Sequence, residues 1–153
     1  SWYEQQNKRV IRLRSVKDKI DVRHDGIVKK GIKVNKLEDA NVENCDVISV
    51  DEVQFFLDTE LIDEWADKGK IVIISAIFST FEQKAWPSIA KLLAKCEHIK
   101  QLKAVCNYCQ KVAYFSYRLT QEKEIEVVGS ENYFPICRKC LQSRKKIECN
   151  FKN

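Results

Sequence analysis

Short apolar runs alternate with charged or amphipathic stretches through the first two thirds of the chain. Three runs rich in β-branched residues predict strands, namely Lys8–Ser15, Asp46–Asp51 and Lys70–Ile77. The third run is apolar on both faces, as is typical of a strand covered on both sides of a parallel sheet. A fourth run, Ile99–Val105, predicts a further strand.

Two stretches carry apolar residues at the spacing of an amphipathic helix. They are residues 58–68 and Pro87–His98, and the second has its proline at the helix start. Strands that alternate with helices predict a mostly parallel α/β sheet. The charged stretch Lys17–Lys36 is expected to be a loop or a short hairpin around residues 24–26.

Four cysteines form two Cys-x-x-Cys pairs with 27 residues between them. A two-residue spacer lets two thiolates converge on one ion, and two such pairs complete a tetrahedral shell of sulfur ligands. Zinc is the expected metal, with an iron–sulfur centre as the alternative. Because no ligand position stays open, this zinc would be structural. The intervening residues read as strands Val112–Leu119 and Glu124–Gly129, so the metal would clamp the base of a hairpin. The four ligands are Cys106, Cys109, Cys137 and Cys140.

Composition narrows the class of protein. A chain of 153 residues is one domain, or one domain with a small module. Its seven cysteines are an odd number, which favours reduced thiols or metal ligands in a reducing compartment over a secreted disulfide framework. No apolar run approaches the ~20 residues needed to cross a bilayer. The net charge of +5 is a mild excess and does not by itself indicate nucleic-acid binding.

An acidic pair, Asp51-Glu52, follows the apolar run that begins at Val47, which is the pattern of a Walker-B element. In phosphoryl transfer such an aspartate orients Mg²⁺, and a neighbouring carboxylate can accept a proton from a hydroxyl. The alternative is a solvated strand end. The partner motif G-x-x-x-x-G-K-[ST] does not occur among these 153 residues. Either the chain is no phosphotransferase, or its phosphate-binding segment is expected upstream of Ser1.

Taken together, these residues resemble the thymidine kinases of the cytosolic, poxvirus and bacterial type. Asp51–Phe56 resembles their D-E-x-Q-F-F segment, and the cysteine frame with the residues between follows their zinc and lasso region. The match runs from about Lys8 to Arg144. The resemblance implies an α/β fold with a P-loop-kinase-like, mostly parallel sheet, here truncated at its N-terminus, followed by a small zinc-ribbon-like β-hairpin lobe. The expected domains are a kinase-like domain without its P-loop at 1–104, a zinc-binding lasso domain at 105–145 and a basic tail at 146–153.

The resemblance also implies an activity, which is the transfer of the ATP γ-phosphate to the 5′-hydroxyl of thymidine, giving dTMP for DNA-precursor salvage. Glu52 matches the general base, and Asp51 matches the acid on the Mg·ATP side. A cytoplasmic homotetramer with a structural zinc is implied, with neither membrane nor nucleic acid as a partner. The implied nucleoside contacts are Gln54, Phe55, Phe81, Ser116, Ile125, Val127 and Tyr133.

Two alternatives stay open. The family's Asp-x-Arg element is Asp18-Lys19-Ile20 here, without the arginine, which fits an inactive or truncated relative that binds a nucleoside or partner subunits. From another class, a zinc-ribbon module could bind nucleic acid through basic segments, with three aromatic residues stacking on bases. These are Tyr114, Phe115 and Tyr117, whose simpler interpretation is packing of the hairpin.

Overall fold

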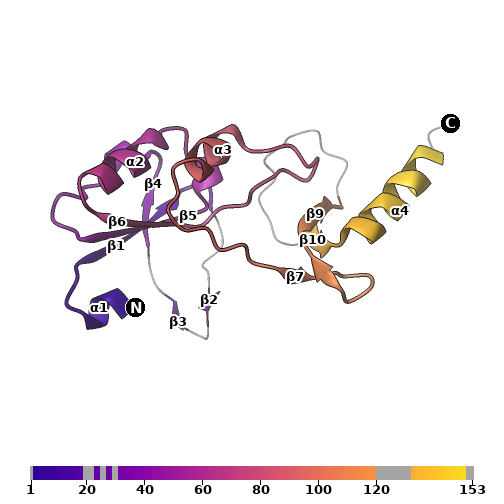
Figure 1. Cartoon of the computed structure of the whole chain (residues 1–153), viewed down its shortest axis with the longest axis horizontal. Helices are drawn as coiled ribbons and strands as arrows, with labels where there is room; N and C mark the ends of the chain where they lie inside the picture. Colours follow the sequence, from indigo (N-terminus) through magenta and orange to yellow (C-terminus); the bar gives the residue numbers. More distant parts are fainter. Residues whose placement is uncertain (1, 19–22, 25–26, 29–30, 120–131, 151–153) are drawn as a thin grey trace. The chain divides into compact units, whose positions relative to one another are not determined.

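The computed structural model describes residues 2–18, 23–24, 27–28, 31–119 and 132–150, drawn in colour in Figure 1. The chain divides into two compact units. The first unit comprises Ser1–Phe78 and Ala85–Glu97, and the second comprises Ser79–Lys84 and His98–Asn153. Of the helices in these described ranges, none is long and apolar enough to cross a membrane.

A four-stranded parallel sheet in the order β4-β1-β5-β6 forms the centre of the first unit. The three strands predicted from apolar runs are present. The first two are one or two residues shorter than predicted, and the third keeps only Ile71–Ile74 of Lys70–Ile77. Both predicted helices are present, and Pro87 is the first residue of the second. The described elements of this unit are α1 (Trp2–Gln5), β1 (Val10–Ser15), β2 (Arg23–His24), β3 (Ile27–Val28), β4 (Ile32–Val34), the 3₁₀ helix η1 (Leu37–Asp39), β5 (Val47–Asp51), the 3₁₀ helix η2 (Val53–Phe55), α2 (Glu60–Asp67), β6 (Ile71–Ile74) and α3 (Pro87–Leu93).

One face of this sheet carries the core. The strand register aligns Leu13 with Val50 and Val50 with Ile74, so these side chains share one face. Helices α2 and α3 lie over one face of the sheet (Figure 1). Trp65 of α2 and Leu92 of α3 belong to the same core cluster as Leu13 and Val50. The apolar stripes of both helices therefore fix which side of the sheet is buried.

The opposite face is more polar. Here the register aligns Arg12 of β1 with Ser49 of β5, and Ser49 with Ile73 of β6. Ile73 is 44% exposed, so the prediction that β6 is covered on both faces is wrong for the described residues. The reason is that α2 and α3 pack against the other face, and β6 is the last strand of the described sheet.

The charged segment after β1 holds both the predicted hairpin and a strand that the sequence did not indicate. β2 and β3 pair antiparallel, with His24 beside Ile27, in agreement with the predicted hairpin. β4 then pairs parallel with β1, with Ile32 beside Leu13. Lysines around and within this three-residue strand interrupt the apolar pattern, so its assignment depends on pairing with β1.

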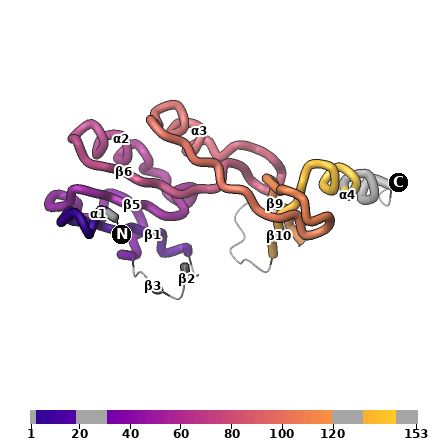
Figure 2. The backbone as a smooth tube through the Cα atoms, turned by 60° about the horizontal axis from the view of Figure 1, so that its bottom comes forward, coloured from indigo at the N-terminus to yellow at the C-terminus, as the bar shows by residue number. Residues whose placement is uncertain are grey.

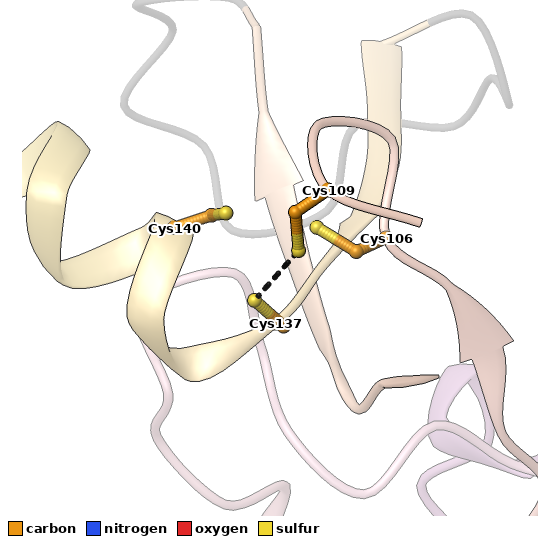
Figure 3. A group of neighbouring side chains, drawn as sticks. All are labelled: Cys106, Cys109, Cys137 and Cys140. Carbon is orange, nitrogen blue, oxygen red and sulfur yellow. Dashed lines mark hydrogen bonds between the residues drawn. The ribbon is translucent and has the colours of Figure 1, made fainter. Parts of the chain in front are cut away.

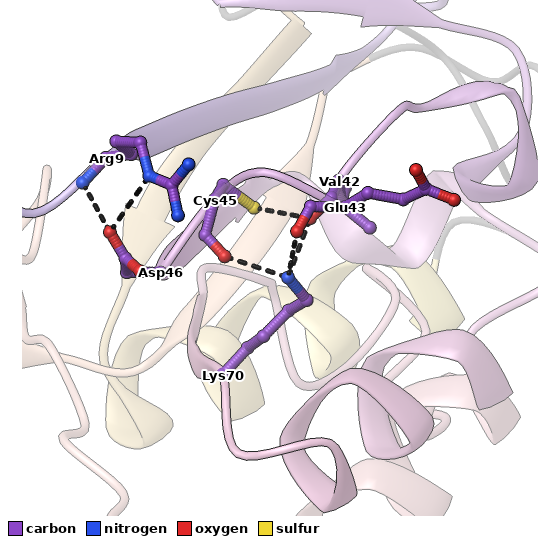
Figure 4. Close-up of polar contacts among 6 residues, drawn as sticks. All are labelled: Arg9, Val42, Glu43, Cys45, Asp46 and Lys70. Carbon is purple, nitrogen blue, oxygen red and sulfur yellow. Dashed lines mark hydrogen bonds and ion pairs between the residues drawn. The ribbon is translucent and has the colours of Figure 1, made fainter.

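A lysine secures the loop that leads into β5. The Nζ of Lys70, just before β6, donates hydrogen bonds to the backbone carbonyls of Val42, Glu43 and Cys45 at 2.7, 3.2 and 2.8 Å (Figure 4). In the same figure, the backbone N–H of Arg9 donates to the Asp46 carboxylate at 2.8 Å. These contacts set where β5 begins, and hence where its carboxyl end lies.

The second unit is built from two small antiparallel pairs and a helix. β7 pairs with β8, and β9 pairs with β10, which leads into α4 (Figure 2). Its small core consists of buried residues that include two cysteines. The described elements are β7 (Ala104–Val105), β8 (Val112–Ala113), β9 (Phe115–Arg118), β10 (Tyr133–Ile136) and α4 (Arg138–Asn150).

Two strand predictions for this unit need correction. Ile99–Val105 is a strand only at its last two residues, because the described residues 99–103 have no neighbouring strand with which to pair. Val112–Leu119 is broken at Tyr114 into β8 and β9, which belong to different pairs. The partner of β9 is Tyr133–Ile136, and the predicted strand Glu124–Gly129 lies outside the described residues.

Candidate active site and metal centre

The acidic pair lies at the carboxyl end of β5. Asp51 is the last residue of the strand, and its Oδ1 accepts hydrogen bonds from the Ser75 hydroxyl and, at 3.1 Å, from the Glu52 backbone N–H. Glu52 follows with a φ of 53°, in the left-handed region that few non-glycine residues adopt. Such strain is concentrated at functional sites in proteins, where the surrounding structure maintains it.

The carboxylate of Glu52 is half-buried and held from one side. The Nε2 group of Gln54 donates a hydrogen bond to its Oε2. Burial raises the pKa of the Glu52 carboxyl above its ordinary value, and the negative charges of Asp51 and Asp18 act in the same direction. The Gln54 hydrogen bond and the positive charge of Arg14 oppose that rise. A raised pKa makes this carboxylate a stronger proton acceptor than an ordinary glutamate.

A buried ion pair that sequence reasoning missed lies at the same end of the sheet. Arg14 aligns with Asp51 across β1 and β5, and its Nη2 lies 2.5 Å from Oδ2 of Asp18. Its Nε donates to the same oxygen at 3.1 Å. Buried charges are stable only when paired, so this pair fixes both side chains. The available signal was the two arginines, Arg12 and Arg14, that alternate with apolar residues in β1.

Two predicted nucleoside contacts follow Glu52 in η2. Gln54 is 4% exposed, and its Oε1 accepts a hydrogen bond from the backbone N–H of Ile77 at 3.3 Å. Both ends of its amide therefore contact the protein, and together they join the carboxyl ends of β5 and β6. Phe55 is half-buried in the same turn.

The four predicted metal ligands come together in the second unit (Figure 3). Cys106 and Cys109 lie in the turn between β7 and β8, Cys137 follows β10, and Cys140 is in the first turns of α4.

The spacing of these four sulfurs suits a tetrahedral ion. Their Sγ atoms all lie within 4.8 Å of one another, and those of Cys109 and Cys137 are 3.5 Å apart. A Zn–S bond of ~2.3 Å gives a tetrahedron with S–S edges of ~3.8 Å. A disulfide needs about 2.05 Å, and these four cysteines are free thiols. The chemistry and the spacing of the donors thus fit one metal ion.

Local hydrogen bonding favours the thiolate form at one of these ligands. Desolvation raises the pKa of the Cys106 thiol, but hydrogen bonds from backbone N–H groups in both Cys-x-x-Cys segments lower this pKa to about 6. The thiolate is the form that binds metal. The turn also fixes this residue, because the Cys106 N–H donates to the Lys111 carbonyl at 2.7 Å.

Three further predicted nucleoside contacts lie in the second unit. Phe81 belongs to the Ser79–Lys84 turn, Tyr133 begins β10, and Ser116 is exposed on β9. Tyr133 aligns with Arg118 of β9, and the Arg118 guanidinium lies over the ring of Phe81. Phe81 and Tyr133 are thus linked through a residue to which the sequence assigned no role. The remaining two predicted contacts, Ile125 and Val127, lie outside the described residues.

The three aromatic residues considered for nucleic-acid stacking differ in their exposure. Tyr117 stacks on Phe134 with ring centroids 5.1 Å apart, and Phe115 packs against the small core. Tyr114 is 50% exposed. Two of the three therefore pack within the lobe, as the simpler interpretation of the sequence holds.

Sequence comparison identifies known relatives of this chain. A family model described as thymidine kinase matches residues 2–141. The thymidine kinase of sheeppox virus is 44% identical over 121 residues, which are 76% of this chain and 68% of that protein. That of Yaba monkey tumor virus is 41% identical over 123 residues, 78% of this chain and 68% of that protein. Thymidine kinase 1 of Dictyostelium discoideum is 38% identical over 126 residues, 80% of this chain and 56% of that protein.

A parallel α/β unit with an acidic pair at the end of β5, together with a unit that carries a four-cysteine cluster, is consistent with the kinase class that these comparisons indicate. The chain belongs to the thymidine kinase family.

Proposed function

We propose that this protein is a thymidine kinase, which transfers the γ-phosphate of ATP to the 5′-hydroxyl of thymidine and yields dTMP. The observation that carries the proposal is the position of Glu52, a half-buried carboxylate at the carboxyl end of a parallel strand in a chain of this family. Ligands of open α/β sheets bind beyond this edge of the sheet.

Glu52 is the general base. It accepts the proton of the 5′-hydroxyl as the oxygen attacks phosphorus, while the γ-phosphoryl group leaves ADP. Its raised pKa suits this task, because a stronger base takes the proton more readily as long as it is ionised at the working pH. The hydrogen bond from Gln54 holds the carboxylate in one orientation.

Asp51 faces the Mg·ATP side. Its carboxylate is oriented by the Ser75 hydroxyl and by the Glu52 N–H, and carboxylate oxygens are the ligands that Mg²⁺ prefers. When bound, Mg²⁺ neutralises charge on the phosphates.

The proposed nucleoside contacts are those that the resemblance implies. They are Gln54, Phe55, Phe81, Ser116, Ile125, Val127 and Tyr133. A dry slot lined by aromatic side chains with a few hydrogen-bonding groups suits a pyrimidine.

The metal held by the four cysteines is zinc, and its role is structural. Four thiolates leave no ligand position for substrate, so the ion stabilises the lobe and takes no part in chemistry. We further propose that the protein acts as a cytoplasmic homotetramer, as the resemblance to the family implies.

The test is transfer of phosphate from Mg·ATP to thymidine, measured on this polypeptide and on the full translation product of its gene. We expect dTMP formation, and a loss of about 10²- to 10⁴-fold in Glu52→Gln. The matched control is Glu64→Gln, which changes an exposed glutamate on α2 and should leave the rate unchanged. Thymidine binding without transfer by the full product would instead identify an inactive relative. Unchanged activity in Glu52→Gln would remove Glu52 as the base.

A further inference from the structure

Arg118 makes a close contact that the proposed reaction does not use. It is the last residue of β9, it is 7% exposed, and its Cζ atom lies 3.7 Å from the centroid of the Phe81 ring. A guanidinium this close to an aromatic ring gains both cation–π attraction and planar stacking. The contact is intrinsic to the second unit, because both residues belong to it.

The turn that carries Phe81 is compact. Thr80 is buried, and its backbone N–H donates to the Lys84 carbonyl at 2.9 Å. Gln83 adopts a φ of 66°, and its N–H donates to the Thr80 carbonyl at 2.9 Å. These two hydrogen bonds close the turn and fix the backbone on either side of Phe81.

The other side of Arg118 leads to the metal centre. Across the β9–β10 pair Arg118 aligns with Tyr133, and three residues after Tyr133 the strand ends at buried Ile136, which precedes Cys137. A short hydrogen-bonded strand pair therefore connects the four-cysteine cluster to the arginine beneath Phe81.

We propose that Arg118 is a positioning residue that fixes the ring of Phe81 as a stacking surface for the pyrimidine ring of the nucleoside. This role rests on the proposed function, in which Phe81 lies beside the base. The guanidinium covers one face of the ring, and the opposite face is presented to the substrate. A held ring loses little conformational entropy when the base stacks, so the effect is expected in nucleoside affinity rather than in the phosphoryl-transfer step.

The first test is independent of any substrate. Protons above an aromatic ring face resonate upfield, so the Arg118 side-chain NMR signals should lie upfield and return to ordinary positions in Phe81→Leu. The matched control is Tyr108→Leu, which removes a ring 4.4 Å from the Cζ of Arg144 and should shift the Arg144 signals but leave those of Arg118 unchanged. Arg118 signals that are identical with and without Phe81 would overturn the proposal.

The second test measures thymidine. In the full gene product, Arg118→Met should weaken thymidine binding and raise its KM about tenfold, with kcat and the KM for ATP unchanged. Arg118→Lys, which keeps the charge but loses the planar stack, should fall between Arg118→Met and the unaltered protein. Arg144→Met removes another guanidinium–ring contact of the lobe and should leave thymidine affinity unchanged.

The outcomes separate the two proposals. Equal thymidine affinity in Arg118→Met and the unaltered protein, or a loss in kcat alone, would overturn the role of Arg118. If the unaltered full product bound no thymidine, the proposed function would fail, and the NMR comparison would still decide whether Arg118 holds Phe81. Zinc content and circular dichroism identify a variant that has merely unfolded.

Discussion

The two units of this chain are stabilised by different kinds of core. The described core of the first unit has eleven buried apolar residues drawn from strands, helices and turns. That of the second has five buried residues, of which Cys106 and Cys137 belong to the four-cysteine cluster. A small module with so little apolar burial depends on cross-links or metal for its stability. The comparison predicts that the sheet of the first unit stays folded without a metal, whereas the order of the second unit depends on one.

Removal of the metal is the change with the largest expected effect. A chelator, or Cys106→Ser, should unfold the second unit and leave the sheet of the first unit folded, because structural zinc binding contributes about 10–16 kcal/mol in small modules. Amide hydrogen exchange resolved by residue would show loss of protection in β9 and β10 but not in β1 and β5. Cys96→Ser, outside the cluster, is the control, and equal loss of protection in both units would contradict the comparison.

Breaking the buried ion pair should destabilise the first unit alone. Arg14→Met leaves the Asp18 carboxylate buried without this partner and should lower the free energy of unfolding by about 3–5 kcal/mol. The double variant with Asp18→Leu should recover much of the loss. Urea unfolding gives the free energies, and bound zinc measured on the same samples should stay constant. A single variant as stable as the parent would argue against the pair.

Removing the lysine clamp should have a smaller effect. Lys70→Met leaves three carbonyls without the ammonium donor, but the loop is partly exposed and water can replace it, so we expect a loss of about 1–2 kcal/mol. Thermal unfolding measures this loss. The control is Lys68→Met, which changes a neighbouring exposed lysine and should alter stability little.

The smallest expected effect on stability comes from changing Glu52, the proposed general base. The folded-state pKa of Glu52 is raised, so its contribution to stability is fully present below its unfolded pKa and is lost as the pH rises through the folded pKa. Glu52→Gln should therefore be slightly more stable than the parent at neutral pH, with the difference vanishing in acid. Activity should fall as the pH drops through this same raised pKa. A variant less stable at neutral pH would contradict the assigned direction.

The sequence predicted most of the first unit but less of the second. Apolar periodicity predicts β1, β5, β6, α2 and α3, because each of these elements buries one face with regularly spaced apolar side chains. β4 escaped prediction because three residues beside lysines carry too little pattern. In the second unit, strands of two to four residues depend on their partners, so Val112–Leu119 was assigned as one strand where there are two.

For the sites, spacing alone determined the four cysteines and the acidic pair. The Cys-x-x-Cys spacing is a local pattern, and so is an apolar run that ends in Asp-Glu. Both can be read directly from the sequence. The side-chain contacts around these and the other site residues came only from the tertiary structure. Arg14 pairs with the charge of Asp18, and Gln54 donates a hydrogen bond to Glu52. Arg118 covers a face of the Phe81 ring. Such contacts depend on which segments the fold brings together. Arg118 and Phe81 are 37 residues apart, and a local sequence pattern carries information only about neighbouring residues.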